Sequence, residues 1–238
     1  MGENVVEYEV RDRIAHVTIT NGKANALSPA VIAAVGDALT RAEDAGEDAV
    51  GAVLLTSTPG MFSGGFDLKV MREGAAAAGK LVTDGGELFS RILGAPIPVI
   101  AACTGHAVAA GALLLMGCDY RVGALGEFQI GLIETKLGMV LPRWAVELSR
   151  ERLSVRHFQQ ATVGARMYEP TTAVDAGFLD AAVPPEALTE AALAEARRWA
   201  ELPRAAYRGQ VLMNRGERLG RLADAIAEDR GRSFDVPT

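Results

Sequence analysis

Two segments of this sequence repeat one order of features, and that order constrains the fold more than any other property of the chain. Each begins with a short apolar stretch typical of a buried parallel strand, Val50–Leu55 in one segment and Pro98–Cys103 in the other. A glycine-rich turn follows each stretch, and a helical pattern follows each turn. Strand, turn and helix in repeated order predict an α/β fold of βαβ units with right-handed crossovers.

The N-terminal part predicts a β-hairpin and a helix. Tyr8–Val10 and Ile14–Thr20 alternate apolar and polar residues on either side of a predicted turn at Arg11-Asp12. Ser28-Pro29 places a favourable N-cap residue before a proline at the first helical position. We therefore expect a helix to begin there.

The middle of the chain contains one segment of low complexity. Gly74–Lys80, with the sequence GAAAAGK, is interpreted as a mobile loop, and helical spacing resumes at Glu87–Leu93. Gly105–Gly117 is predicted to turn into a helix. Short strands are predicted at Tyr120–Val122 and Glu127–Ile130.

From Leu141 onward the pattern is helical almost throughout. The predicted helices are Trp144–Leu148, Val155–Thr162, Thr172–Ala176, Pro185–Leu202, Ala205–Asn214 and Leu219–Asp229. A boundary near Pro184-Pro185 divides a core, residues 1–184, from a helical part, residues 185–238. We expect the helical part to pack on the core or on neighbouring subunits of an oligomer.

Composition excludes several classes of protein. The 238 residues carry 24 basic and 30 acidic side chains, a net charge of −6, without the basic stretches of a nucleic-acid-binding protein. Met1–Val10 is too polar for a signal peptide, and no apolar run approaches the roughly 20 residues of a membrane span. Cys103 and Cys118 lie in apolar surroundings, and the three histidines are scattered. We expect a cytoplasmic protein with reduced cysteines and no metal site.

The first glycine-rich turn, Met61–Leu68, reads MFSGGFDL. The first amides of a helix lack intrahelical acceptors and favour negative charge, and two glycines allow close approach of a ligand. Asp67 suits a helix cap, and Ser63 does not sit in the G-x-S-x-G pattern of a nucleophile. On these residues alone, an anion site and an ordinary strand-to-helix turn both remain open.

The second turn, Thr104–Leu113, reads TGHAVAAGAL and also follows a predicted strand. Small residues again allow a close approach to the backbone. Neighbouring parallel strands would bring the two helix starts together and aim two N–H groups at one oxygen. Two donors where negative charge develops are what an oxyanion hole requires.

These motifs, taken in order, resemble the enoyl-CoA hydratase/isomerase family, also called the crotonase family. The resemblance extends from about Val5 to Ala200. The matching segments are ANALS (24–28), FSGGFDL (62–68), PVIAACTGHAVAAGALLLMGCDYR (98–121), IGLIETKLGMVLPRWAVELSR (130–150) and GFLD (177–180), followed by Val183-Pro184.

The resemblance implies a crotonase-like stack of βαβ units (a ββα superhelix), assembled as homotrimers or pairs of trimers. It also implies that the oxyanion hole consists of the amides of Phe66 and Ala110. Coenzyme A, as part of an acyl-CoA substrate and not a permanently bound cofactor, would run past Gly64 and along one loop. The residues of that loop are Lys23, Ala24, Ala26 and Leu27.

The family's hydratases use two glutamates, and this chain matches one of them. The first position falls on Leu113, which cannot transfer a proton, and the second falls on Glu134. Burial disfavours the charged form of a carboxylate and brings its pKa towards neutrality. A single glutamate resembles the pattern of Δ3,Δ2-enoyl-CoA isomerases, so the expected reaction moves the double bond of a 3-enoyl-CoA to the 2-position.

Three alternatives remain open at this stage. Glu134 could activate water in an unusual hydratase, with Asp84 or Glu87 as the second acid. The chain could be an acyl-CoA-binding or regulatory protein without turnover, because a fold does not determine function. On the residues alone, Glu134 could also be a surface or capping glutamate. Gly74–Lys80 and the C-terminal helices are expected to line the acyl pocket, whose preferred chain length the sequence does not indicate.

Overall fold

The computed structural model describes residues 4–234, which fold around two sheets. All neighbouring strands pair in parallel except β1 and β2, which pair antiparallel. The larger sheet has the order β1-β2-β3-β5-β7-β9, and the smaller has the order β4-β6-β8. The strands are β1 (Val6–Arg11), β2 (Ile14–Ile19), β3 (Ala52–Ser57), β4 (Gly60–Ser63), β5 (Val99–Cys103), β6 (Gly105–Val108), β7 (Tyr120–Ala124), β8 (Ile130–Gly131) and β9 (Ala181–Val183).

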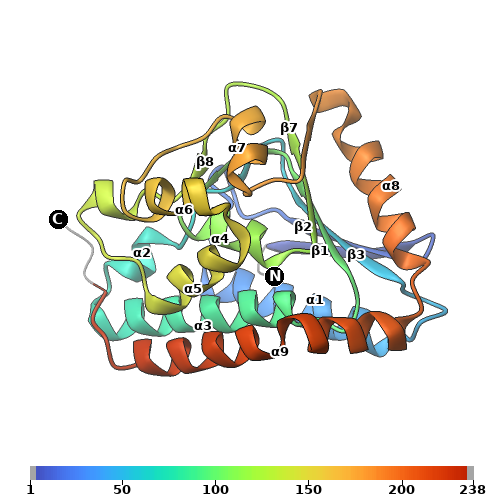
Figure 1. Cartoon of the computed structure of the whole chain (residues 1–238), viewed down its shortest axis with the longest axis horizontal. Coiled ribbons are helices and arrows are strands. Elements are labelled where there is room, and N and C mark those ends of the chain that lie inside the picture. The colour runs from blue at the N-terminus through green and yellow to red at the C-terminus, as the bar shows by residue number, and fades with distance from the viewer. Residues whose placement is uncertain (1–3, 235–238) are drawn as a thin grey trace.

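Helices cover both faces of the larger sheet, and the predicted α/β class is confirmed (Figure 1). The α-helices are α1 (Pro29–Asp44), α2 (Leu68–Met71), α3 (Ala75–Leu93), α4 (Ala110–Gly117), α5 (Arg143–Arg152), α6 (Val155–Thr162), α7 (Pro170–Ala176), α8 (Leu188–Ala200) and α9 (Arg204–Asp229). Two short 3-10 helices are η1 (Glu134–Leu137) and η2 (Pro185–Ala187).

Alternate residues of the central strands enter two different apolar layers. In β3, Val53 and Leu55 join the large cluster that contains α1, α3 and α4, whereas Ala52 and Leu54 join the cluster under α8. Successive side chains of a strand point to opposite faces, so a strand buried on both faces is apolar at nearly every position. That is why β3 and β5 are recognisable from sequence as continuous apolar runs.

The N-terminal hairpin forms, but its turn lies one residue later than predicted. β1 continues through Arg11, and the turn residues are Asp12 and Arg13, with φ of 50° and 62°. Two positive φ values give a turn whose twist matches that of the strands it joins. The helix that follows begins as predicted, because the Ser28 side chain accepts from the Val31 amide and Pro29 is the first helical residue.

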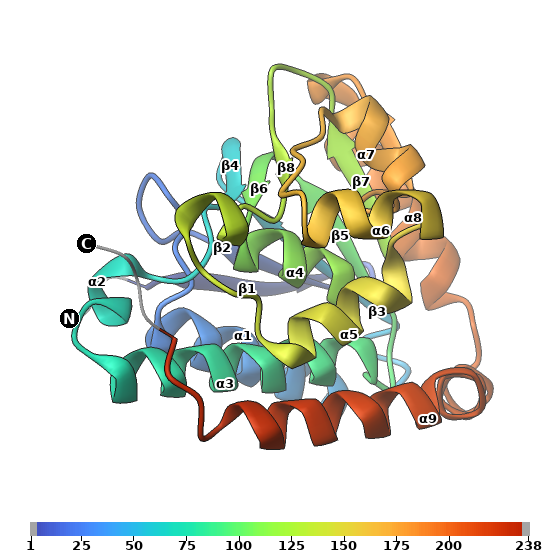
Figure 2. The ribbon, with the colours of Figure 1, turned by 60° about the vertical axis from the view of Figure 1, so that its left-hand side comes forward.

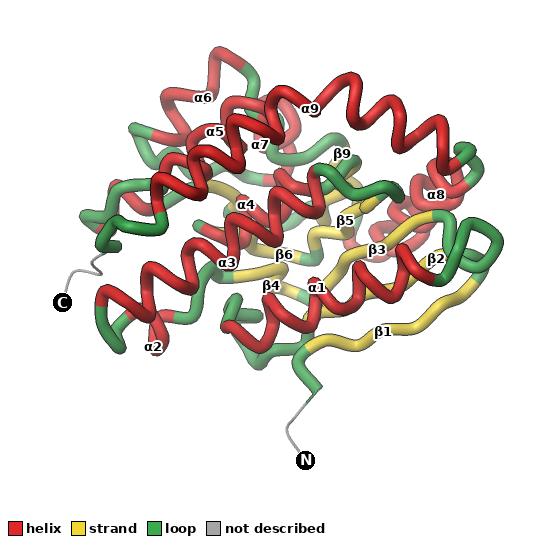
Figure 3. The backbone as a smooth tube through the Cα atoms, turned by 90° about the horizontal axis from the view of Figure 1, so that it is seen from below, coloured by secondary structure: helices red, strands yellow, loops and turns green. Residues whose placement is uncertain are grey.

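The interpretation of Gly74–Lys80 as a loop is wrong, since α3 begins at Ala75. Alanine has the highest helix propensity of any residue, and the tertiary packing of this segment outweighs the cost of its glycines. Ala78 and Gly79 are buried in the first turns of the helix. Figure 3 shows part of α3 running beside α1.

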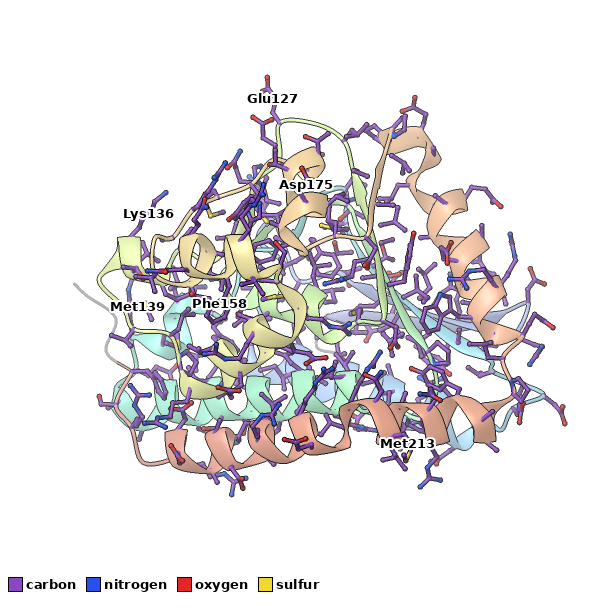
Figure 4. The ribbon with its side chains drawn as sticks, in the orientation of Figure 1. Glu127, Lys136, Met139, Phe158, Asp175 and Met213 are labelled. Atoms are coloured by element: carbon purple, nitrogen blue, oxygen red, sulfur yellow. The ribbon has the colours of Figure 1, made fainter. Side chains whose placement is uncertain are left out.

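Two further predictions near the second turn are corrected. Gly105–Val108 is not helical but forms strand β6, because it pairs with β4 on one side and β8 on the other. Glu127–Gln129 is not a strand but part of the loop that leads to β8, and Glu127 lies at the tip of that loop in Figure 4. Gly126, with φ of 151°, bends the chain immediately before Glu127.

The C-terminal helices pack on the rest of the chain. α8 covers one face of the larger sheet, and α9 runs beside α3 and α5 on the other side of the molecule (Figures 1 and 2). α9 is one continuous helix where two were predicted. The junction is held by two ion pairs, Arg215 with Asp119 and Arg218 with Glu151, which offset the helix-breaking tendency of Gly216.

Both cysteines are free and buried, as predicted, and burial raises the pKa of each thiol to about 12. Among residues 4–234, no helix combines the length and apolar character required to cross a membrane. The same residues contain no cluster of three histidine, cysteine, aspartate or glutamate side chains able to hold a metal ion.

Candidate active site

The three residues predicted to carry the chemistry follow three neighbouring parallel strands. Phe66 follows β4, Ala110 follows β6 and Glu134 follows β8. The carboxyl ends of parallel strands meet at one edge of a sheet, where α/β proteins place their ligands. Figure 2 shows β4, β6 and β8 side by side above α4. The smaller sheet therefore brings the three predicted residues to one edge.

The two glycine-rich turns touch each other, and glycines make the contact possible. A Cβ atom on Gly65 would lie 3.0 Å from the Cβ of Ala109 and 3.3 Å from the amide nitrogen of Ala110. A Cβ atom on Gly111 would lie 2.2 Å from the carbonyl oxygen of Ser63, which is closer than atoms can approach. These contacts hold the Phe66 and Ala110 amides in adjoining turns.

Within residues 4–234, neither the Phe66 N–H nor the Ala110 N–H donates a hydrogen bond to another atom of the protein. Both amides are therefore free to bind a ligand. Ala110 is the first residue of α4, where the helix provides no acceptor. The residue before it, Ala109, has φ of 54° and ψ of −125°, a conformation that a residue with a side chain rarely adopts. Strain of this kind, about 1–3 kcal/mol, gathers at functional sites.

The loop predicted to bind coenzyme A is joined to the first turn by backbone hydrogen bonds. The Gly64 amide donates to the Ala24 carbonyl at 2.8 Å, and the Leu27 amide donates to the Gly65 carbonyl at 2.8 Å. The Asp67 amide returns a bond to the Leu27 carbonyl at 3.2 Å. Lys23 and Ala24 are exposed and Ala26 is half-buried, so the outer side of this loop is open to a ligand beside the two amides.

Asn25 anchors the same loop, and sequence reasoning missed its role. Its buried side chain donates to the Met61 carbonyl and to the Thr58 hydroxyl, both at 2.7 Å, and accepts from the Asn21 amide at 3.0 Å. Its φ is 43°, and asparagine is among the few residues that tolerate this region. That tolerance is the sequence signal that could have identified the position.

Glu134 is the first residue of η1 and is 9% exposed. Its Oε2 atom is buried and has no hydrogen-bond partner within the described chain. Burial raises the pKa of the Glu134 carboxyl to about 7, although the amides of Glu134 and Ile133 oppose the rise. The carboxyl group can therefore both accept and return a proton near neutral pH. Lys136 and Met139, in the same segment, lie at the same end of the molecule as α2 (Figure 4).

The other positions considered from sequence have different surroundings. Leu113 is buried in α4 among apolar side chains. Asp84 pairs with Lys80 at 2.6 Å, and Glu87, whose side chain is 50% exposed, pairs with Arg230 at 2.5 Å. Unlike Glu134, both carboxylates of α3 are therefore engaged in ion pairs.

Ser63 and Asp67 serve the local structure. Ser63 is buried, and its hydroxyl accepts from the Gly65 amide at 3.2 Å, which shapes the first turn. Asp67 caps α2, as predicted, by accepting from the Lys69 amide at 2.8 Å.

Comparisons with known proteins all point to one family. A sequence model described as enoyl-CoA hydratase/isomerase matches residues 9–226. The human mitochondrial enoyl-CoA delta isomerase 1 is 32% identical over 158 residues, which are 64% of this chain and 51% of the human protein. The chain thus spans about half the length of that relative.

Two solved structures share the fold over nearly their whole length. An enoyl-CoA hydratase/isomerase family protein from Pseudomonas syringae is 43% identical with a TM-score of 0.93, covering 96% of this chain and 98% of the other. An enoyl-CoA hydratase from Mycobacterium marinum is 35% identical with a TM-score of 0.90, covering 97% and 100%. The similar proteins therefore carry both isomerase and hydratase names.

Proposed function

Because the chain belongs to the enoyl-CoA hydratase/isomerase family, we propose that it moves the double bond of a 3-enoyl-CoA to the 2-position. Glu134 is the sole acid and base of this reaction. The amides of Phe66 and Ala110 bind the thioester oxygen. Coenzyme A is part of the substrate, held along Lys23–Leu27 and past Gly64, and no permanently bound cofactor is required.

The reaction has two proton transfers. The Glu134 carboxylate takes a proton from C2, the C2–H electron pair moves into the acyl system, and the negative charge of the resulting dienolate resides on the thioester oxygen. The two backbone amides stabilise that charge, because they are already oriented and donate to no protein acceptor in the described chain. The Glu134 carboxyl then returns the proton at C4, which leaves the double bond between C2 and C3.

One observation favours proton relocation over hydration. Among the described residues the buried Oε2 of Glu134 has no hydrogen-bond partner, whereas Leu113 occupies the position that matches the family's other glutamate. Addition of water requires a general base for the water and an acid for the α-carbon, while a 1,3-proton shift requires one group that does both. The isomerase name of the human relative supports the same reaction.

Hydration of a 2-enoyl-CoA is the second candidate, because similar proteins are named hydratases. It would require Asp84 or Glu87 to leave its ion pair and act as the second acid.

The test is to give the purified protein a 3-enoyl-CoA and, separately, a 2-enoyl-CoA, and to identify the products by chromatography and mass. We expect 2-enoyl-CoA from the first substrate and little 3-hydroxyacyl-CoA from the second. Rapid hydration that disappears in Glu134→Gln would favour the hydratase. Tight binding of both esters without any product would indicate a protein that binds acyl-CoA and does not turn it over.

A further inference from the structure

Two consecutive glycines, Gly85 and Gly86, lie in the interior of α3. A glycine inside a helix costs roughly 1 kcal/mol relative to alanine, so a pair of them requires a packing reason. At Gly85 that reason is Phe66, because a Cβ atom would lie 2.4 Å from Cε1 and 2.5 Å from Cζ of its ring. The ring of the residue that supplies one oxyanion amide rests directly on the backbone of α3.

Buried aromatic side chains block any movement of the Phe66 ring towards the core. The ring stacks on Phe89, with ring centroids 6.4 Å apart and planes at 12°. Phe89 is fully buried and packs against Trp144 in an edge-to-face arrangement, with ring centroids 5.7 Å apart. Trp144, also fully buried, rests on Gly86, where a Cβ atom would lie 2.9 Å from its ring. The two glycines therefore leave room beside α3 for three aromatic rings packed in a row, with no space between them into which the Phe66 ring could move.

The backbone on either side of Phe66 is fixed as well. The carbonyl of Gly65 and the amide of Asp67 are both bonded to Leu27. The position of a Cβ on Gly65 is already at contact distance from Ala109. The Gly65 carbonyl and the Phe66 N–H belong to one planar peptide unit. A ring displaced by a side chain at position 85 would therefore pull on this unit through the Phe66 Cα, strain its bond to Leu27 and tilt the Phe66 N–H.

We infer that Gly85 is a positioning residue for the oxyanion hole: the absence of a side chain there seats the Phe66 ring and so directs the Phe66 amide at the thioester oxygen. This inference rests on the proposed function for the role of that amide. It assigns to α3, which supplies no reacting group in the proposed mechanism, a part in catalysis.

Gly85→Ala tests the inference, with Gly36→Ala as the matched control. Both variants add a methyl group inside a helix, but at Gly36 in α1 its nearest neighbour is the end of the Arg91 side chain at an ordinary 3.9 Å. For Gly85→Ala we expect kcat to fall about 100-fold with a much smaller change in KM. Gly36→Ala should keep the wild-type kcat. Equal kcat values for Gly85→Ala and the wild type would overturn the inference.

A second pair of variants covers the case in which Gly85→Ala does not fold. In Phe66→Ala the ring is absent, so adding Gly85→Ala should leave kcat within about twofold of Phe66→Ala alone. If the double variant is instead much less active than Phe66→Ala, Gly85 acts by another route and the inference fails.

A spectroscopic measurement separates this inference from the proposed reaction. The carbonyl stretching frequency of a bound saturated acyl-CoA, which does not react, reports donation to the thioester oxygen. We expect a shift to lower frequency in the wild type and in Gly36→Ala, and a smaller shift in Gly85→Ala. A shifted carbonyl without isomerase turnover would contradict the proposed function and leave the inference standing. An equal shift in all three proteins would contradict the inference, whatever the turnover.

Discussion

Glu134 and Asp119 are both buried carboxylates, but the protein surrounds them differently. Asp119 Oδ2 accepts from the Val99 amide at 2.8 Å and from the Tyr207 hydroxyl at 2.9 Å, and Arg215 lies 2.8 Å from Oδ1 in an ionic contact. Burial raises the pKa of Tyr207, which keeps its hydroxyl protonated as a donor. Glu134 Oε2 has no such partner within the described residues.

The difference shows how the same chemical group serves structure in one place and chemistry in another. Asp119 precedes β7, and its partners on α9 and β5 join the long C-terminal helix to the larger sheet. A paired buried charge holds elements together, and removing one partner is costly. A buried carboxylate with no charged partner and one oxygen unpaired among the described residues instead binds a proton near neutral pH, which lowers stability above that pH and suits proton transfer.

Replacing Glu134 tests the chemical half of this comparison and has the largest expected effect. In Glu134→Gln we expect isomerase turnover to fall by about 10³-fold or more, because general acid–base catalysis supplies about 10²–10⁴-fold and no second carboxylate replaces it. Turnover can be followed by chromatography of the 2-enoyl product. Activity within tenfold of the wild type would show that another group carries the proton.

The same variant should not lose stability. The folded pKa of about 7 lies above that of an ordinary glutamate, so the wild type loses stability as pH rises from about 4.5 to about 7. At pH 8, Glu134→Gln is expected to be more stable than the wild type by up to about 3 kcal/mol in urea denaturation.

Replacing Asp119 tests the structural half. Asp119→Asn keeps the shape of the side chain but leaves Arg215, whose side chain is 14% exposed, without its counter-charge. We expect a loss of about 3 kcal/mol in the free energy of unfolding, with kcat per folded molecule unchanged. A stable variant with impaired turnover would reverse the roles assigned to the two carboxylates.

The pH dependence of the wild type gives a smaller effect. A base must be ionised in the free enzyme, so kcat/KM should rise about tenfold per pH unit below pH 7 and level off above it. Binding of a saturated acyl-CoA over the same range is the control, because it requires no proton transfer. An activity that is already level at pH 5 would mean that the carboxyl of Glu134 is not the titrating base.

The sequence predicted the parts of the fold whose signals are local. The cap at Ser28, the span of α6 and the buried strands β3 and β5 depend on adjacent residues or on continuous apolar runs. The start of α3 and the continuity of α9 were missed. Both depend on tertiary contacts of residues that are ambiguous by themselves, such as the buried Gly79 and the ion pair of Arg215.

The site could be predicted only through the resemblance. Nothing local distinguishes Glu134 from a surface glutamate, and its lack of a partner appears only once β8 and η1 bury it. The strain at Ala109 and the seat of Phe66 on Gly85 were not predicted either. Both arise where segments far apart in the sequence come into contact, and no pattern along the chain records such contacts.

The fate of the transferred hydrogen tests the central claim, a single carboxyl that carries one proton from C2 to C4. The measurement uses a 3-enoyl-CoA deuterated at C2, with mass spectrometry and NMR of the 2-enoyl product. Glu134 is only 9% exposed, so the deuteron it removes should exchange slowly with water, and we predict deuterium at C4 in a substantial fraction of product molecules. If the hydrogen gained at C4 comes only from solvent, from the first turnover onward, the account is contradicted.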